Sequence, residues 1–156
     1  MADRPGTVPW LDPLEMRAWR SLLHATAQLN AVLDVELVAA HDLPLADYAV
    51  LVTLSEADDR RLRMHELAER LQLSPSGLTR RVDRLTRAGL VDRERCDTDG
   101  RGTFAVLTTR GLRRLEDAAP THVDGVRRHF VDRLDRRSLA TLGDLLDRVA
   151  EPDGKK

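Results

Sequence analysis

The stretch SPSGLTRRVDRLTRAGL, which runs from Ser74 to Leu90, places arginines among small polar residues. Three apolar residues in it are spaced as the inward face of a helix requires, at i, i+4 and i+7: Leu78, Val82 and Leu85. At about 100° per residue, Arg80 and Arg84 then point nearly opposite to that face. An outward surface of arginine, serine and glycine suits the phosphates and base edges of DNA.

The arginines and serines on the outward side of this helix have expected roles. Arg80 and Arg84 are predicted to reach the major groove, since arginine can bind guanine O6 and N7 in a bidentate way. Residues near the helix start, together with Arg87, are predicted to hold phosphate and set the register. The predicted DNA-contacting set is Ser74, Ser76, Gly77, Thr79, Arg80, Arg81, Arg84, Arg87 and Arg101. The alternative is a solvated charged face with no partner, which is the commoner meaning of an arginine-rich helix taken alone.

Arg101 lies in the polar connector DTDGRG and has two possible roles, which can coexist. At the tip of a hairpin it would enter the adjacent minor groove, where narrow A·T-rich segments focus negative potential. It could instead pair with Asp83 or Asp99 and hold the hairpin against the arginine-rich helix.

Charge is distributed unevenly along the 156 residues, although the net charge is only -1. Lys and Arg against Asp and Glu number 3 to 10 in residues 1–59, 12 to 7 in 60–110, and 10 to 9 in 111–156. Positive charge is therefore gathered in the middle third. A basic unit between less basic flanks is compatible with phosphate binding by that unit and another task for the rest.

The elements around the arginine-rich helix predict a winged helix-turn-helix. Ser74 and Pro75 can open that helix as cap and first residue, and Gly89 can end it. The preceding stretch RLRMHELAERLQL indicates a short extended piece and a helix, and LADYAVLVTLSEA indicates an earlier helix. The strand-like runs LVDRERC and TFAVLT flank the glycine-containing connector and predict a hairpin, the wing.

The two ends of the chain are predicted to be helical arms. A first helix opens with Asp12, Pro13 and Glu15 and stops at Pro44. Thr109 is predicted to cap a long helical region to about Leu134, interrupted by a kink at Pro120. Asp135 or Ser138 would start a final helix.

The arms carry more apolar surface than the winged unit can cover. The stripe residues are Trp19, Leu22, Leu29, Leu33, Leu37, Val123, Val126, Phe130 and Leu134. Burial against a second copy in a two-fold dimer is the economical solution. The fold class predicted is mainly α with a small β-hairpin wing: an amino-terminal dimerisation helix (1–43), a winged helix-turn-helix (44–108) and carboxyl-terminal dimerisation helices (109–156).

Simple features of the sequence indicate the cellular compartment of the protein. A single cysteine, Cys96, excludes an internal disulfide framework and indicates a reducing environment. The amino end lacks the apolar region of a signal peptide, and no apolar run approaches the roughly 20 residues that span a bilayer. We expect a soluble cytoplasmic protein with no membrane partner.

The predicted order of elements resembles the MarR family of winged helix-turn-helix regulators from about Trp10 to Val149. The stretches that carry the resemblance are ADYAVLVTL, LAERLQLSPSGLTRRVDRLTRAGLV and DGRGTFAVLTTRG. The resemblance implies a homodimeric bacterial transcription regulator, usually a repressor, that leaves a pseudo-palindromic DNA operator when it binds a small-molecule effector or is oxidised. Its effector pocket, mapped between the dimer arms and the winged unit, would be lined by Trp19, Leu23, His24, Tyr48 and Leu112.

Other functions have weaker support in the sequence. Peroxide-sensing members of the family carry a cysteine near the start of the first helix, and this chain has none there, so Cys96 is interpreted as an ordinary small hydrophobe. The five histidines form no tight metal-ligand motif, and no metal or other cofactor is expected. Trp19 fits core packing better than a ligand platform. No nucleophile with a base and no phosphate loop supports an enzyme. The stronger rival is a helical dimeric adaptor that does not bind DNA.

Overall fold

The first helix of the computed structural model, α1 (Pro13–His41), starts where its capping residues predict. The structure describes residues 8–95 and 102–150. The Asp12 carboxylate accepts hydrogen bonds from the backbone N–H groups of Leu14 and Glu15, and Glu15 accepts one from the N–H of Asp12. This capping box satisfies three backbone donors at the helix start. The helix ends at Asp42, whose φ of 47° is left-handed.

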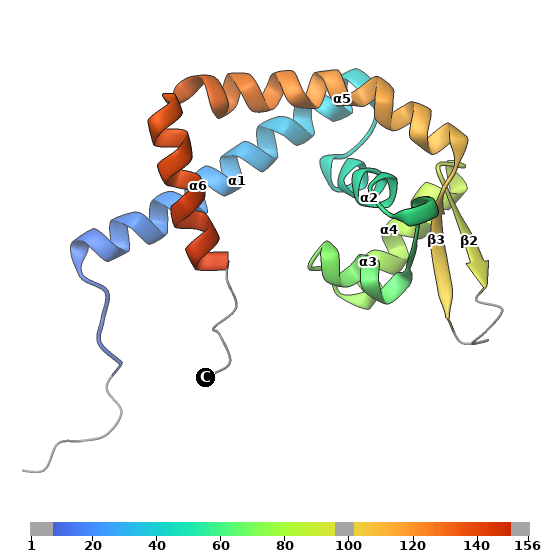
Figure 1. The fold of residues 1–156 in the computed structure, drawn as a ribbon, viewed down its shortest axis with the longest axis horizontal. Helices are drawn as coiled ribbons and strands as arrows, with labels where there is room; N and C mark the ends of the chain where they lie inside the picture. The colour runs from blue at the N-terminus through green and yellow to red at the C-terminus, as the bar shows by residue number, and fades with distance from the viewer. Residues whose placement is uncertain (1–7, 96–101, 151–156) are drawn as a thin grey trace, which may run out of the picture.

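The basic middle of the chain folds into a unit of helices and a small sheet (Figure 1). Its elements are α2 (Leu45–Ser55), η1 (Asp58–Arg60), β1 (Arg61–Arg63), α3 (Met64–Arg70), α4 (Pro75–Arg87), β2 (Val91–Arg95) and β3 (Thr103–Leu107). The strands are antiparallel in the order β1-β3-β2, with both Leu62 and Arg93 opposite Ala105. The predicted hairpin is therefore confirmed, and the short extended piece before α3 joins it as a third strand.

The core of this unit is formed by the predicted inward faces of its helices. The buried side chains of α2, α3 and α4 include Val50, Leu51, Leu54, Leu67, Leu78, Val82 and Leu85. Strand residues Val91, Ala105 and Leu107 complete the core from the sheet side. The outward arginines of α4 are thus held on a rigid support.

The start and end of α4 also follow the sequence. The Ser74 hydroxyl accepts a hydrogen bond from the backbone N–H of Gly77 at 3.1 Å, and Pro75 occupies the first helical turn. After the helix, Gly89 has a φ of 69°, which glycine adopts without strain.

Replacing Ser74 with alanine should lower the free energy of unfolding by about 1 kcal/mol, because the N–H of Gly77 loses its cap. Chemical denaturation at fixed protein concentration measures the loss. Ser76→Ala, two residues on and exposed, is the matched control. Equal stability of the two variants would show that this cap contributes nothing.

Helix α5 (Thr109–His129) differs from the prediction in its cap and its length. The cap is Thr108, not Thr109: its hydroxyl oxygen accepts a hydrogen bond from the N–H of Gly111 and lies within bonding distance of the Gly89 and Leu90 carbonyls. Sequence periodicity does not distinguish two adjacent threonines, whereas these contacts with the end of the α4 segment select the first.

Pro120 does not interrupt α5, which is one continuous helix. Its axis bends along its length (Figure 1), and Pro120 is exposed, so its ring is accommodated on the solvent side. The helix ends at His129 rather than near Leu134, and η2 (Val131–Arg133) follows. Helix α6 (Arg136–Ala150) follows directly after Asp135, whose carboxylate accepts a hydrogen bond from the N–H of Ser138.

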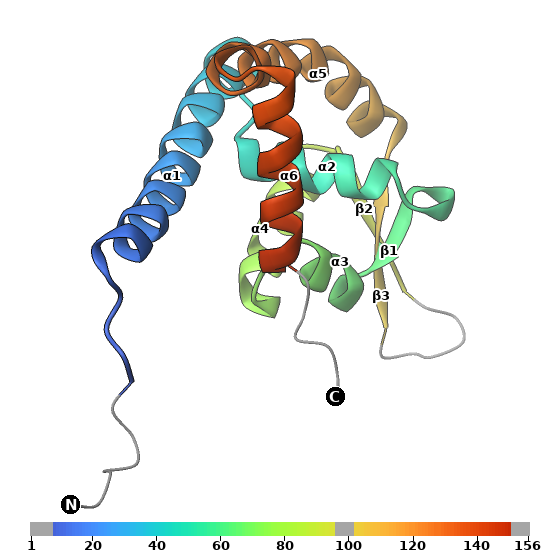
Figure 2. The same ribbon diagram turned by 60° about the vertical axis from the view of Figure 1, so that its left-hand side comes forward.

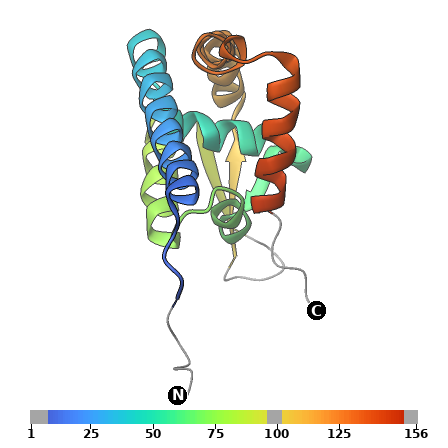
Figure 3. The ribbon, with the colours of Figure 1, turned by 90° about the vertical axis from the view of Figure 1, so that its left-hand side faces the viewer.

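The apolar stripes of the arms are covered only in part within the single chain: Leu33 and Leu37 are buried, contrary to the expectation that they need a second copy, whereas Trp19 and Val123 are exposed. In α1 only Leu33 and Leu37 are buried, and α6 contains no buried residue at all. Figures 2 and 3 show α6 standing apart from the amino-terminal half of α1, although the two cross in the view of Figure 1. The single chain therefore leaves α6 and the amino-terminal half of α1 uncovered.

Among the described helices, none is by itself long and apolar enough to cross a membrane. Helices α1 and α2 meet that length and composition only when taken together, across a bend of 84°.

Candidate nucleic-acid interface

The face of α4 that points away from the core carries a strip of exposed polar side chains. Its central members are Ser76, Arg80 and Arg87, which lie within about 40° of one another around the helix axis. Arg80 and Arg87 donate Nε–H bonds only to carbonyls one turn back in their own helix. Neither forms an ion pair with any residue in the parts of the chain that the structure describes, so both guanidinium groups remain available to an anion.

One flank of this strip is tied to α2 by a residue that sequence reasoning missed. Asp47, in the first turn of α2, is only 2% exposed. Its carboxylate accepts hydrogen bonds from Arg84 Nε at 2.7 Å and Arg84 Nη2 at 2.5 Å. Arg81 Nη1 lies 3.4 Å from the same carboxylate, and the bond to Asp47 raises the pKa of Arg84. Arg84, predicted to read base edges, is thus also held by the core.

The other flank of the strip is tied to the wing. Arg93 of β2 donates from Nη2 to Asp83 Oδ1 at 3.0 Å and to the Thr79 carbonyl at 3.3 Å. Asp83 was one of two predicted partners for Arg101, and in the structure it pairs with Arg93. Arg101, like Asp99 and Cys96, lies outside the described residues.

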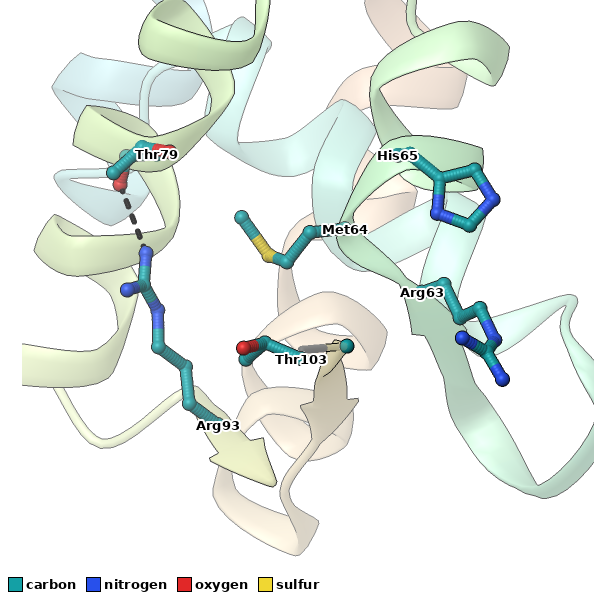
Figure 4. Close-up of a pocket in the computed structure, with 7 residues that line it drawn as sticks. Arg63, Met64, His65, Thr79, Arg93 and Thr103 are labelled. Atoms are coloured by element: carbon teal, nitrogen blue, oxygen red, sulfur yellow. Dashed lines mark hydrogen bonds between the residues drawn. The ribbon is translucent and has the colours of Figure 1, made fainter. Parts of the chain in front are cut away.

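A cleft of about 320 Å³ opens between α3, α4 and the wing (Figure 4). Its lining residues are Arg63, Met64, His65, Thr79, Arg93, Gly102 and Thr103. Only Thr79 belongs to the predicted DNA-contacting set. Arg63 and His65 come from the β1–α3 junction and Arg93 comes from β2, so the helical periodicity of α4 gave no signal for any of the three.

Two β1 arginines also brace the wing. The guanidinium carbons of Arg61 and Arg63 lie 4.0 and 5.3 Å from the centroid of the Phe104 ring in β3. Arg61 Nη1 is 3.7 Å from Glu94 Oε2 in β2. Cation–π contacts of this kind stabilise exposed sites by about 0.5–1 kcal/mol, so they help fix the wing relative to α3 and α4.

The five predicted effector-lining residues are not brought together within one chain. Trp19, Leu23 and His24 are exposed on the amino-terminal half of α1. Tyr48 is 7% exposed in the core that also contains Leu37. Trp19 and Leu37 are 18 positions apart in one helix, or about 27 Å along its axis.

Tyr48 contacts His122 of α5, a residue the sequence did not single out. The two ring centroids are 4.6 Å apart. Burial raises the pKa of the Tyr48 phenol and lowers the pKa of the His122 imidazole, so both rings are neutral near pH 7. Leu112, half-buried, packs against the same core. Among the described residues, no group of three or more His, Cys, Asp or Glu side chains is placed to hold a metal ion.

Known proteins of similar sequence and structure share this architecture. The MarR family model matches residues 41–102, which run from the end of α1 to the wing. Over 153 residues the chain is 29% identical to the HTH-type transcriptional repressor YetL of Bacillus subtilis (strain 168), covering 96% of this chain and 91% of YetL.

Two solved structures from Streptomyces coelicolor extend the likeness to nearly the full length. AbsC, a MarR family transcriptional regulator, is 40% identical with a TM-score of 0.85, over 92% of this chain and 96% of AbsC. Sco3205, a MarR family transcriptional regulator solved in complex with DNA, is 39% identical with a TM-score of 0.88, over 95% of both chains. With its three-stranded winged unit between long helical arms, the chain belongs to the MarR family of transcriptional regulators.

Proposed function

We propose that the protein is a sequence-specific DNA-binding transcription regulator, a ligand-responsive repressor that acts as a homodimer on a pseudo-palindromic operator. The observation that carries the proposal is the exposed strip on α4, where Arg80 and Arg87 lack any acidic partner among the described residues. The opposite face of α4, formed by Leu78, Val82 and Leu85, is buried. Arginines presented outward by a helix that is anchored in this way are suited to reading a major groove. As a cytoplasmic regulator it would meet its operator directly.

The DNA would lie across α4 and the cleft beside it. Arg80 is assigned to base edges, and Ser74, Ser76 and Arg87 to phosphates that fix the register. His65 and Arg93 add polar donors on the wing side of α4 (Figure 4). A duplex backbone passing between α4 and the wing would meet these donors.

The second copy is proposed to cover the exposed apolar residues of the arms. They include Leu14 (68% exposed), Trp19 (51%), Val123 (55%), Leu145 (49%) and Val149 (74%). Clusters of large exposed apolar side chains of this kind mark protein interfaces. A two-fold axis through the arms would also place two α4 helices for half-sites one DNA turn, roughly 34 Å, apart.

The effector is proposed to bind where one chain's Tyr48 region meets the arms of the second copy. Such a site could bring the exposed Trp19, Leu23 and His24 of α1 near a winged unit that their own chain does not place beside them. To weaken DNA binding tenfold, the effector must favour the non-binding spacing by about 1.4 kcal/mol. Linkage then requires the operator to weaken effector binding by the same factor, which titrations with and without DNA measure.

Replacing Arg80 with alanine should cost about 1–3 kcal/mol of operator binding if it makes a bidentate base contact. The test is an electrophoretic shift with the protein's own upstream DNA, first for the wild type and then for the variant. Arg136→Ala, an exposed arginine at the start of α6, removes the same charge away from α4. Equal affinity of the wild type and Arg80→Ala would remove α4 from the reading role.

A dimeric adaptor without DNA binding is the second candidate, since it would use the same exposed arms. In that case Arg80 and Arg87 serve solubility alone. The wild-type shift experiment separates the two, because an adaptor would leave the upstream DNA unshifted at low salt.

A further inference from the structure

We infer that Asp47 is a positioning residue for base recognition: it holds Arg84 so that one edge of the guanidinium is presented to the DNA. The inference rests on the proposed function and deepens it by naming a residue outside the arginine-rich helix. Asp47 lies in α2, 37 positions before Arg84 in the sequence.

The geometry of the pair leaves a defined part of Arg84 free. Nε and Nη2 both donate to the Asp47 carboxylate, to Oδ2 at 2.7 Å and to Oδ1 at 2.5 Å. This parallel pairing uses the Nε/Nη2 edge of the guanidinium. The Nη1/Nη2 edge remains, and two parallel donors are what guanine O6 and N7 accept.

Exposure differs sharply between the partners. The Arg84 side chain is 53% exposed, whereas that of Asp47 is 3% exposed. Asp47 therefore reaches Arg84 from the protein side while the rest of the guanidinium faces outward. Arg84 also lies beside the exposed strip on α4, about 40° around the helix from Arg80.

Ion pairs with two arginines of α4 hold the Asp47 carboxylate in place. A buried charge without a partner is costly, and Asp47 satisfies its charge with the two α4 arginines. Arg81 Nε is itself buried without a hydrogen-bond partner, and Arg81 Nη1 is 3.4 Å from Asp47. The second cation keeps the carboxylate paired when Arg84 is altered, so Arg84 variants should still fold.

Holding the arginine in advance matters because its side chain is otherwise free. An unrestrained arginine carries about 2 kcal/mol of rotamer entropy that binding must remove. With Asp47 in place, part of that cost is met on folding, before DNA is encountered. Loss of Asp47 should therefore weaken the reading of the base pair that Arg84 contacts, and not DNA binding in general.

The test compares Asp47→Asn, Arg84→Met and the double variant on the protein's own operator, mapped by footprinting, and on copies with each base pair substituted. Arg84→Met should lower affinity about 5- to 150-fold and flatten the preference at one base pair in each half-site. Asp47→Asn should flatten the preference at that same base pair, with an affinity loss of about threefold or more. The double variant should be no weaker than Arg84→Met.

Asp124→Asn is the control, because it removes the same charge from an exposed ion pair with Arg128 in α5. It should leave affinity and base preference unchanged. Circular dichroism and sedimentation establish that each variant is folded and dimeric. If Asp47→Asn does not fold, Asp47→Glu takes its place: it keeps the buried charge but displaces the carboxylate from its pairing with Arg84 Nε and Nη2, and should flatten the same base preference.

Three results would overturn the inference. Asp47→Asn could lower affinity equally for every operator copy, its effect could add to that of Arg84→Met, or Arg84→Met could leave all base preferences intact. The first would make Asp47 a support of the fold alone. Wild-type protein that shifts no DNA would instead refute the proposed function, and the inference would fall with it.

Discussion

Aspartate in place of both Leu142 and Leu146 in α6 should abolish the dimer and reduce operator affinity at least about 100-fold. Helix α6 has no buried residue in the single chain, and in the proposed dimer its apolar side packs against the second copy. Two charges inside that contact would be desolvated without partners. A monomer would then hold one half-site and lose the gain of 10²–10⁴, in order of magnitude, that joining two binding units provides.

Sedimentation velocity and electrophoretic shift measure the two effects in parallel. Ala140→Asp is the control: it adds one carboxylate to α6, half the charge of the double variant, about 160° around the axis from Leu142. A double variant that stays dimeric would show that α6 lies outside the interface. So would a wild-type chain that is a folded monomer at micromolar concentration, since such large apolar interfaces are usually obligate.

Replacing Gly111 with alanine should destabilise the fold by about 3 kcal/mol or more, near the upper end of single-residue effects. A Cβ at this position would lie 2.0 Å from the Leu90 carbonyl oxygen and 2.8 Å from Leu107 Cδ1. The first neighbour is a backbone atom, so it cannot relieve the clash by changing rotamer as a side chain can. Relief requires the start of α5 to move away from the base of the wing.

Denaturant unfolding at one protein concentration compares this variant with Gly143→Ala, a second helical glycine. An added Cβ at Gly143 meets nothing within 4 Å, so stability there should be unchanged or raised by about 0.5–1 kcal/mol through helix propensity. If the two alanine variants were equally stable, the approach of α5 to Leu90 would be looser than the structure shows.

Local signals in the sequence were enough to place the first arm and most elements of the winged unit. The caps at Asp12 and Ser74 and the left-handed Gly89 act within a few residues of themselves, and the structure confirms all three. The inward face of α4 follows from periodicity alone, because any packed helix must bury one side.

What the sequence did not reveal depends on contacts between distant segments. Periodicity gives the direction of Arg84 but not its partner Asp47. The pairing of Asp83 with Arg93 joins α4 to a strand of the wing, and helical periodicity gives no signal for it. The third strand is short, and only its alignment with β3 makes it a strand. For the effector residues, helix length is decisive: Trp19 and Tyr48 belong to parts of the chain that α1 keeps apart.

The continuous helix α5 connects the winged unit to the arms. It starts at the base of the wing, where Thr108 and Gly111 fix it against Leu90, and its far end is clamped to α1 through Arg128, His129 and Glu36. Its 21 residues span about 31 Å. A rotation of about 10° at the arm would therefore displace the wing end by about 5 Å over that length. In the proposed dimer, an effector bound among the arms would not need to touch the two α4 helices, because α5 would convert a slight change of angle at the arms into a mismatch with the proposed spacing of two half-sites.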